Sequence, residues 1–405
     1  MKKLYLSGLI ILFLMSNLVV AQHINGLNVT SGNSGYTIDF SLPEYSFQRV
    51  DLEQGEFTKL ILPDYGTTTD IGYPALPQIS FNLSITSNDD VKNISVSNLL
   101  SSIEILQSPV YPFQEPWPRN KPLKERPFSF NTKYYSSTGD PNAPLYKISE
   151  PYVIGGVKGV TITIYPFAFN PVAKQLKVVK HATFTIELQK PVERVNGLSD
   201  SYNLFLKSFF QDYKAGSSKS LRNYLIITAP EYEAGLAPFI AHKNGLGYNI
   251  TLVTTTVTGT TTTAIKTYIQ NLYANPTTKP EFILLVGDTD KIPAWTGSGT
   301  GSPRTDLNYV LLEGTDYYAD AFIGRFSIAS PSQLQNAINK TIYMENYIGT
   351  FEKKNVYMAS EDNYSITEGT HNFVIDNYFQ PSGYSALKLY THTYNATTQQ
   401  LVNAL

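Results

Sequence analysis

The sequence contains no cysteine among its 405 residues, which excludes a disulfide, a thiolate zinc site and a cysteine nucleophile within the chain. Charge is also scarce, because only 16% of the residues are charged and 31 Lys and Arg nearly balance 33 Asp and Glu. This balance gives no electrostatic reason to expect nucleic acid or an anionic membrane surface as a partner. Beyond the N-terminal region, no stretch is long and apolar enough to span a bilayer.

The N-terminus has the pattern of a secretory signal peptide. Two lysines follow Met1, a long apolar run comes next, and the run closes with small residues that end at Ala21. We therefore expect residues 1–21 to be a signal peptide, and the remaining chain to reach the cell surface or the medium by Gram-negative-type export. A membrane anchor is the alternative, and the lack of a basic stop-transfer cluster argues against it.

Residues 22–195 alternate polar and apolar side chains in several stretches, such as QLKVVKHATFTIEL at 175–188, as half-buried β-strands do. The Pro-rich stretch 108–128 does not fit a central strand, because each proline lacks the N–H that a sheet uses. Gly155 and Gly156 lie between strand-like stretches and predict a hairpin turn rather than a phosphate loop, since no Lys-Ser/Thr pair follows. We expect a β-sandwich-like domain with one long excursion.

Residues 196–222 differ in composition from the segments on both sides. A short amphipathic piece is followed by a stretch rich in Gly, Ser and Lys. We expect a linker that processing proteases cut at its basic residues, Lys214, Lys219 and Arg222.

From residue 223 the pattern alternates between strands and helices. Runs such as NYLIITA at 223–229 and FILLV at 282–286 are continuously apolar, as strands of a parallel sheet covered on both faces are. Helical patterns lie between them, and Ser330–Gln333 forms a capping box at the start of another helix. We expect a doubly wound α/β domain over 223–405.

Later segments of this domain are less regular. Residues 307–327 show no clear period, and we expect an irregular segment there. Farther on, we expect strands at 355–360 and 387–394, a helix over about 370–380 and another helix from about Thr397. The chain stops inside that last helical pattern without a stop signal, so we expect it to be the first part of a longer sequence.

Two carboxylates, Asp288 and Asp290, follow the apolar run 282–286 at the place where open α/β sheets bind ligands. One interpretation is that they cap the turn that leads into Pro293. A phosphatase of the haloacid dehalogenase type would need a threonine where Ile292 stands, and an aspartic protease would need a glycine where Asp290 stands. The residues themselves favour a turn over either catalytic motif.

Four longer stretches belong together: GYPALPQISFNLSI at 72–85, YPFAFNPVAKQLKVV at 165–179, LLVGDTDKIP at 284–293 and DYYADAFIGRFS at 316–327. They resemble parts of the gingipain-type cysteine peptidases, family C25, whose order of signal, β-rich propeptide, basic linker and α/β domain is also similar. The resemblance implies two caspase-like α/β subdomains. It further implies a secreted zymogen of a cysteine endopeptidase, which acts on protein or peptide substrates after Arg or Lys and is inhibited by its own propeptide.

The resemblance also implies a catalytic dyad in the second subdomain, formed by a His that precedes a Gly and by a later Cys. Neither occurs in this chain, which has no Cys and in which no histidine precedes a glycine. The histidines are His23, His181, His242, His371 and His392. We expect the dyad beyond residue 405 and assign no catalytic residue within the chain.

Two further sites are implied by the family. Arginine-specific members hold a carboxylate in the pocket for the basic substrate side chain, and this position falls at Glu368; the alternative is an exposed acid at a helix start. Family members bind structural Ca²⁺ in the stretch that contains Asp316 and Asp320, with Asp306 as a further ligand. The alternative there is a solvated acidic turn.

Two other functions remain open from the sequence. A sortase-like peptidase of an outer-membrane secretion system shares the C25 domain but trims C-terminal signals from its cargo. A non-catalytic secreted binding or adhesion protein would keep the β-rich and α/β parts without the dyad.

Overall fold

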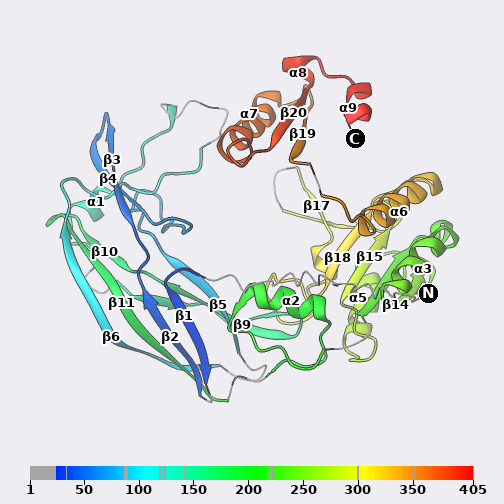
Figure 1. Ribbon diagram of the computed structural model, residues 1–405, viewed down its shortest axis with the longest axis horizontal. Coiled ribbons are helices and arrows are strands. Elements are labelled where there is room, and N and C mark those ends of the chain that lie inside the picture. Colours follow the sequence, from blue (N-terminus) through cyan, green and yellow to red (C-terminus); the bar gives the residue numbers. More distant parts are fainter. Residues whose placement is uncertain are drawn as a thin grey trace, which may run out of the picture.

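The structure is a computed structural model, which describes residues 24–32, 34–85, 90–117, 121, 125–140, 143–190, 192, 194–218, 222–298, 301–350 and 352–404. The expected signal peptide, 1–21, lies outside these residues. Within them, no helix combines the length and the apolar character that crossing a membrane requires. Figure 1 shows three parts along the chain: the strands up to β11, the helix-flanked sheet around β15, and a smaller unit with β19 and β20.

The first part consists of two five-stranded sheets. One sheet has the order β1-β2-β11-β10, with β6 paired to β11: β1 (Leu27–Gly32), β2 (Gly35–Ser41), β6 (Val91–Ile105), β10 (Phe167–Asn170) and β11 (Gln175–Leu188). The other has the order β12-β5-β9-β7, with β8 paired to β9: β5 (Ile79–Ile85), β7 (Tyr146–Ile148), β8 (Tyr152–Ile154), β9 (Val157–Ile164) and β12 (Phe210–Gln211). A separate hairpin joins β3 (Ser46–Leu52) to β4 (Gly55–Ile61).

The core of this part lies between the two sheets. Ile38 on β2 and Phe184 on β11 pack in one cluster with Phe81 on β5 and Ile162 on β9, and all four are almost completely buried. Their neighbours along each strand are more exposed, which is the alternation that strands solvated on one face show. The described residues between 24 and 195 therefore have the expected β-sandwich architecture, and β12 from the next segment extends it.

The α/β part is built on a parallel sheet with the order β14-β13-β15-β18. Its strands are β13 (Arg222–Thr228), β14 (Tyr248–Thr254), β15 (Phe282–Val286) and β18 (Phe322–Phe326). Three longer helices accompany them: α3 (Ala237–Gly245), α5 (Thr262–Tyr273) and α6 (Pro331–Glu345). The segment 307–327 is irregular up to residue 321 apart from a 3₁₀ turn, as expected, but the strand β18 at its end was missed. The short apolar run of β18 is interrupted by Gly324 and Arg325.

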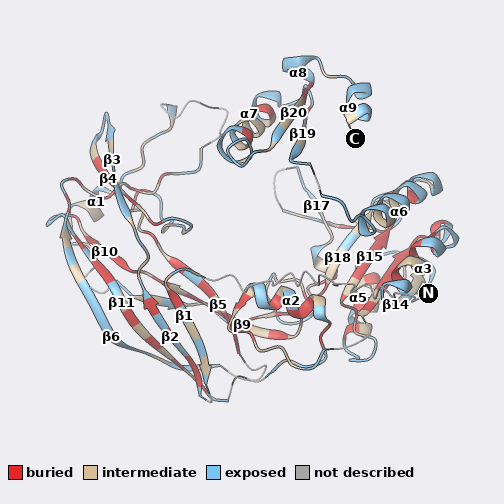
Figure 2. Ribbon diagram, in the orientation of Figure 1, coloured by how far each residue is buried: buried red, intermediate tan, exposed pale blue. Residues whose placement is uncertain are grey.

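Helices cover both faces of this sheet. Leu225 and Leu285 pack with Ile265 of α5 on one face, whereas Ile226 and Leu284 pack on the other face with α3 and α6. Every residue of β15 except Phe282 is buried, and Figure 2 shows the strand between these helices. The continuous apolar runs are thus explained by burial on both sides, and the doubly wound α/β arrangement is confirmed for this sheet.

The smaller unit contains one parallel pair, β19 (Lys354–Ala359) and β20 (Ser385–Tyr390). Between them run α7 (Tyr364–Val374) and a π-helical turn (Ile375–Phe379), so the helix begins six residues before the expected 370. Short elements within the described residues are α1 (Thr132–Tyr135), α4 (Thr255–Thr258), β16 (Trp295–Thr296), β17 (Arg304–Thr305), α8 (Thr391–Tyr394), α9 (Thr398–Ala404) and 3₁₀ helices at Pro230–Tyr232, Ala234–Leu236 and Leu307–Tyr309.

The segment 196–222 is more than a linker. It forms α2 (Asp200–Phe209), which begins at the N-cap Ser199, and then β12, which pairs in parallel with β5 of the sandwich. Tyr202 and Leu206 of α2 are buried, and Figure 2 shows this helix with buried positions between the sandwich and the parallel sheet. The amphipathic piece seen in the sequence is therefore an interdomain helix.

Candidate functional site

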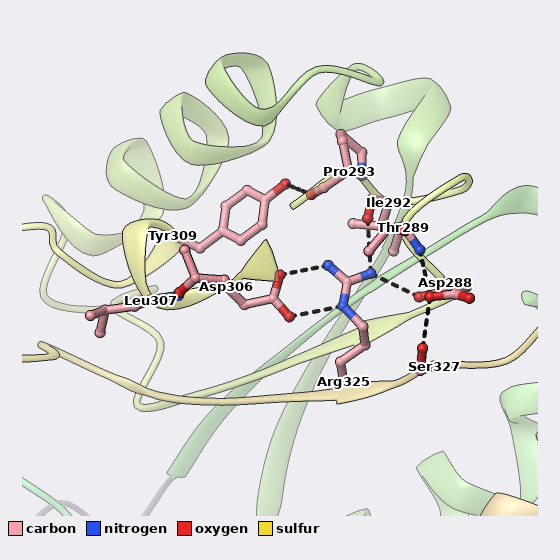
Figure 3. Close-up of polar contacts among 11 residues, drawn as sticks. Asp288, Thr289, Ile292, Pro293, Asp306, Leu307, Tyr309, Arg325 and Ser327 are labelled. Carbon is pink, nitrogen blue, oxygen red and sulfur yellow. Dashed lines mark hydrogen bonds and ion pairs between the residues drawn. The ribbon is translucent and has the colours of Figure 1, made fainter. Parts of the chain in front are cut away.

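The turn after β15 lies at the carboxyl edge of the parallel sheet, where ligands bind in such folds. The Asp288 carboxylate accepts hydrogen bonds from the Thr289 N–H and the Ser327 hydroxyl, both at 2.8 Å (Figure 3). These bonds, the Ser327 bond first, hold the pKa of Asp288 below its usual value. The Asp288 carbonyl also accepts from the Lys291 and Ile292 N–H groups, each at 2.9 Å. Asp288 therefore caps the turn as the sequence suggested.

Asp306 is anchored at the same edge by Arg325 of β18. The guanidinium donates from Nε at 2.8 Å and from Nη2 at 2.7 Å to the two Asp306 oxygens (Figure 3). Its Nη1 donates to the carbonyl oxygens of Gly287 and Ile292, each at 2.8 Å. Both Asp306 oxygens are thus bound by the Arg325 guanidinium, and the role of Asp306 as a calcium ligand stays a prediction.

A hollow of about 370 Å³ opens beside this cluster. Its lining includes Asp288, Arg304, Asp306 and Arg325. Asp288 bonds to Ser327 and Asp306 bonds to Arg325, so these four lining residues support the loop.

Asp316 and Asp320 face the β-sandwich. Asp316 accepts from the Val153 N–H through Oδ2 and from the Tyr318 N–H through Oδ1, both at 2.8 Å. Asp320 is 2% exposed and accepts from the Gly155 N–H through Oδ1 at 3.2 Å. Its Oδ2 accepts from the backbone N–H groups of Leu312 and Glu313, each at 2.8 Å. Burial raises the pKa of Asp320 to about 6 despite these bonds.

These acids do not fit a calcium site in this structure. Calcium takes about six to eight oxygen ligands, whereas each Asp316 and Asp320 oxygen faces an N–H hydrogen that would repel a cation. Across the described ranges, no group of three or more acidic or histidine side chains is placed to hold a metal ion. In this structure these acids are therefore satisfied by N–H groups and by Arg325, and the calcium site expected from Asp306, Asp316 and Asp320 stays a prediction. The burial of Asp320 does not fit the alternative of a solvated acidic turn.

Further contacts join the sandwich, α2 and the α/β domain. The Ser199 N–H donates to Glu281 Oε1 at 3.2 Å, and the Tyr202 hydroxyl donates to the Asp320 carbonyl at 3.3 Å. The Tyr202 ring lies 5.1 Å from the Phe322 ring of β18, and both belong to one apolar cluster with the β8–β9 hairpin. These elements thus form a shared core across the domain boundary.

Gly155 and Gly156 form the turn of that hairpin, as predicted, with φ values of 61° and 84°. A Cβ on Gly155 would lie 2.1 Å from the Tyr202 hydroxyl oxygen and 2.2 Å from its ring. The turn therefore needs glycine both for its backbone and for the close approach of α2.

Glu368 lies on α7 and is 7% exposed, so it is not the exposed helix-start acid of the alternative interpretation. Its carboxylate accepts from the Thr393 N–H at 3.3 Å and from the Thr393 hydroxyl. No lysine or arginine of the described chain forms an ion pair with it. One turn away, burial lowers the pKa of His371, whose Nδ1 has no hydrogen-bond partner among the described residues. Glu368 is therefore a buried carboxylate held by a threonine.

The expected processing residues differ in their surroundings. The Lys214 carbonyl accepts from the Val195 N–H at 3.1 Å, and its Nζ bonds to Asp212 at 2.6 Å. Arg222 begins β13, with its guanidinium 4.1 Å from the centre of the Tyr248 ring. Lys219 lies outside the described residues.

Three of the four described histidines bond to acidic side chains or lie near them. His242 bonds to Glu345 at 2.8 Å and His392 to Glu361 at 2.7 Å, while His181 lies 3.5 Å from Asp39. With no cysteine in the sequence, none of them has a thiol partner within this chain. The expectation that no His–Cys dyad lies within this chain therefore rests on its sequence.

The most informative residues that sequence reasoning missed are Arg325 and Glu281. Arg325 could have been noticed as a charged residue within the short strand FIGRF, where an unpaired cation would be costly. Glu281 gave no such signal, because its role depends on the position of Ser199 at the start of α2.

Comparison with known families assigns the chain to a class of protein. The model of the C25 propeptide matches residues 24–221, and the model described as Peptidase family C25 matches residues 217–405. Together they span nearly the whole sequence, and their boundary falls between α2 and β13. The chain belongs to peptidase family C25, with a propeptide region followed by a region of the peptidase family.

Gingipains of Porphyromonas gingivalis are among its relatives. Gingipain R1 is 25% identical over 327 residues, which are 78% of this chain and 32% of that protein. Lys-gingipain HG66 is 25% identical over 381 residues, which are 88% of this chain and 22% of that protein. The chain thus spans a third or less of the length of these curated relatives. Among solved structures, the complex of Porphyromonas gingivalis RgpB pro- and mature domains is similar, with 16% identity, a TM-score of 0.39 and coverage of 46% of this chain and 97% of that one.

Proposed function

We propose that this chain is the N-terminal portion of an exported cysteine endopeptidase precursor of the gingipain type. The observation that carries the proposal is the docking of the propeptide region on the peptidase region through α2 and the β8–β9 hairpin. Two family matches that meet at residues 217–221 support the division into propeptide and peptidase. The N-terminal sequence supports export.

In the complete protein, catalysis would use a thiolate that attacks the peptide carbonyl and a histidine that moves the proton. Both groups would follow residue 405, within a second caspase-like subdomain. The residues of this chain would supply the scaffold: Arg325 and Asp306 fix the loops at the carboxyl edge of the sheet. The docked propeptide would keep the precursor inactive.

Glu368 would select a basic substrate side chain. A buried carboxylate without a cation is costly, and the charge of an incoming Arg or Lys would offset that cost. The Thr393 hydroxyl and N–H would hold the carboxylate in place until the substrate arrives.

Activation would cut the chain between α2 and β13. Of the three basic residues expected there, Lys214 and Arg222 are held by backbone and side-chain contacts, which disfavour entry into a protease cleft. We therefore place the cut after Lys219.

The test is an assay of the complete natural protein on peptide libraries, before and after propeptide removal. The proposal expects thiol-dependent cleavage after Arg or Lys that appears only after removal. Replacement of the cysteine at the end of the later strand by alanine should abolish it. A complete protein that lacks such a cysteine, or whose hydrolysis survives the replacement, would overturn the proposal and favour a non-catalytic secreted protein.

A further inference from the structure

Three carboxylates of the peptidase region each accept a backbone N–H of the propeptide. The pairs are Val153 to Asp316 at 2.8 Å, Gly155 to Asp320 at 3.2 Å and Ser199 to Glu281 at 3.2 Å. The donors come from two separate places, the tip of the β8–β9 hairpin and the N-cap of α2. No side chain of the propeptide is the donor in any of these three pairs, so the three carboxylates bind the propeptide through its backbone.

The three acids are poorly solvated where they lie. Asp320 is 2% exposed, Glu281 is 5% exposed, and Asp316 is partly buried. A buried carboxylate is costly unless hydrogen bonds satisfy it, and bonds to charged acceptors are stronger than neutral ones. The propeptide N–H groups therefore supply a necessary part of the surroundings of these acids.

The position of each donor suits a carboxylate. Ser199 caps α2, so Glu281 lies at the positive end of the ten-residue helix dipole. Val153 lies on β8, and the acceptor of its N–H is Asp316 of the peptidase region. At the hairpin turn, Gly155 allows the backbone to approach both Asp320 and the Tyr202 ring.

We propose that Asp316, Asp320 and Glu281 form the docking site that holds the propeptide on the peptidase, by its backbone N–H groups and in place of a metal ion. The inference rests on the proposed division into propeptide and peptidase and names what regulates their separation. It follows that the Val153 side chain is replaceable, whereas its N–H donor is not. It also follows that a cation and the docked propeptide exclude each other at Asp316 and Asp320.

The experiment measures how fast a nicked propeptide leaves. The full chain is given a recognition sequence for a specific protease between Ser218 and Arg222, is cut there, and the separation of the two fragments is followed over time by size-exclusion chromatography. Asp316→Asn and Asp320→Asn keep the side-chain shape but turn an amide N–H toward a backbone N–H. Each should speed dissociation about tenfold, the effect expected for a lost bond to a charged acceptor.

A variant of the propeptide tests the hydrogen bond between Val153 and Asp316 at its donor. Val153→Pro removes the donor to Asp316, and proline is tolerated where a strand N–H does not serve its own sheet. It should also speed dissociation about tenfold, whereas Val153→Ala, which keeps the N–H, should stay within about twofold of the unchanged chain. Asp290→Asn, at an exposed acid of the same region, is the matched control for the acidic variants.

Dissociation rates of the proline and asparagine variants that equal those of the controls would overturn the proposal. A second result would also overturn it: Ca²⁺ alone raises the unfolding temperature of the intact chain, and this rise disappears in the double variant Asp316→Asn/Asp320→Asn. The acids would then hold the metal while the propeptide is docked. If Asp320→Asn fails to fold, Val153→Pro still decides, since it changes no peptidase residue. Failure of the peptidase assay would leave these rates unaffected, so the two proposals fail separately.

Discussion

Arg325 and Asp306 form a two-point ion pair, with Nε to Oδ2 at 2.8 Å and Nη2 to Oδ1 at 2.7 Å. The same guanidinium holds the carbonyl oxygens of Gly287 and Ile292, so one side chain on β18 fixes the turn after β15 and the segment before the 3₁₀ helix at Leu307. A lysine has no planar fork and could not reproduce this set of bonds. Arg325 therefore determines the shape of the sheet edge.

Substitution of Arg325 should destabilise the chain markedly. Its side chain is 10% exposed and that of Asp306 is 23% exposed, so Arg325→Ala leaves a poorly solvated carboxylate without its cation. We expect a loss of about 3 kcal/mol in the free energy of unfolding for Arg325→Ala and about half of that for Arg325→Lys. Denaturant unfolding of the 405-residue chain measures it, with Arg304→Lys as the exposed control. Equal stability of Arg325→Lys and the unchanged chain would contradict the assigned role.

Cleavage after Lys214 should be slow in the intact chain. The Lys214 carbonyl accepts from the Val195 N–H, and the Gly216 N–H donates back to the Val195 carbonyl at 2.8 Å, whereas a protease needs an unpaired backbone. Limited trypsin digestion followed by mass spectrometry should give the same first cut in the unchanged chain and in Lys214→Gln. A first fragment that ends at Lys214 would show that these backbone bonds open readily.

Glu368→Gln in the complete, activated protein should lower kcat/KM for substrates cleaved after Arg or Lys about a hundredfold, as expected when a buried partner of a cation is neutralised. Hydrolysis after uncharged residues should change little. Glu361→Gln is the matched control, because Glu361 is an exposed acid of the same unit that bonds to His392. An equal loss for charged and uncharged substrates would assign Glu368 to the stability of α7 instead.

The fold could be predicted where the sequence pattern has a single physical cause. Continuous apolar runs became the parallel strands, and the Ser330–Gln333 box became the start of α6, where the Ser330 hydroxyl accepts from the Gln333 N–H. The start of α7 was misplaced because its N-cap, Asn363, adopts a left-handed conformation with φ 53° and makes no side-chain cap bond. Nothing in the local sequence marks such a start.

The candidate site was less predictable, because its bonds join distant parts of the chain. Asp316 and Asp320 were recognisable as a pair of acids, but each also accepts one N–H that lies more than 160 positions earlier, on a hairpin whose own sequence is unremarkable. Family resemblance suggested oxygen ligands for a metal, and the packing of α2 and the hairpin directs N–H groups at the same oxygens. Spacing along the sequence cannot distinguish these two uses of a carboxylate.

The stability of the peptidase region should depend on pH through Glu345. Its carboxylate bonds to Lys243 at 2.5 Å and to His242 at 2.8 Å, and so ties the end of α6 to α3. Burial opposes ionisation, but the bonds from Lys243 and His242 outweigh it, and the pKa of Glu345 lies below its usual value. A depressed folded-state pKa contributes stability above the unfolded value of about 4.3, which is lost as the pH falls through the folded value.

The free energy of unfolding should therefore fall more steeply below about pH 4.5 in the unchanged chain than in Glu345→Gln. At pH 7 the substitution should cost about 2 kcal/mol, because Lys243, whose side chain is 8% exposed, loses its anion. Urea unfolding at several pH values between 3 and 7 measures both effects, with Glu352→Gln, at an exposed acid, as the control. If the two curves run parallel across this range, the ion pair does not link α3 to α6 in solution.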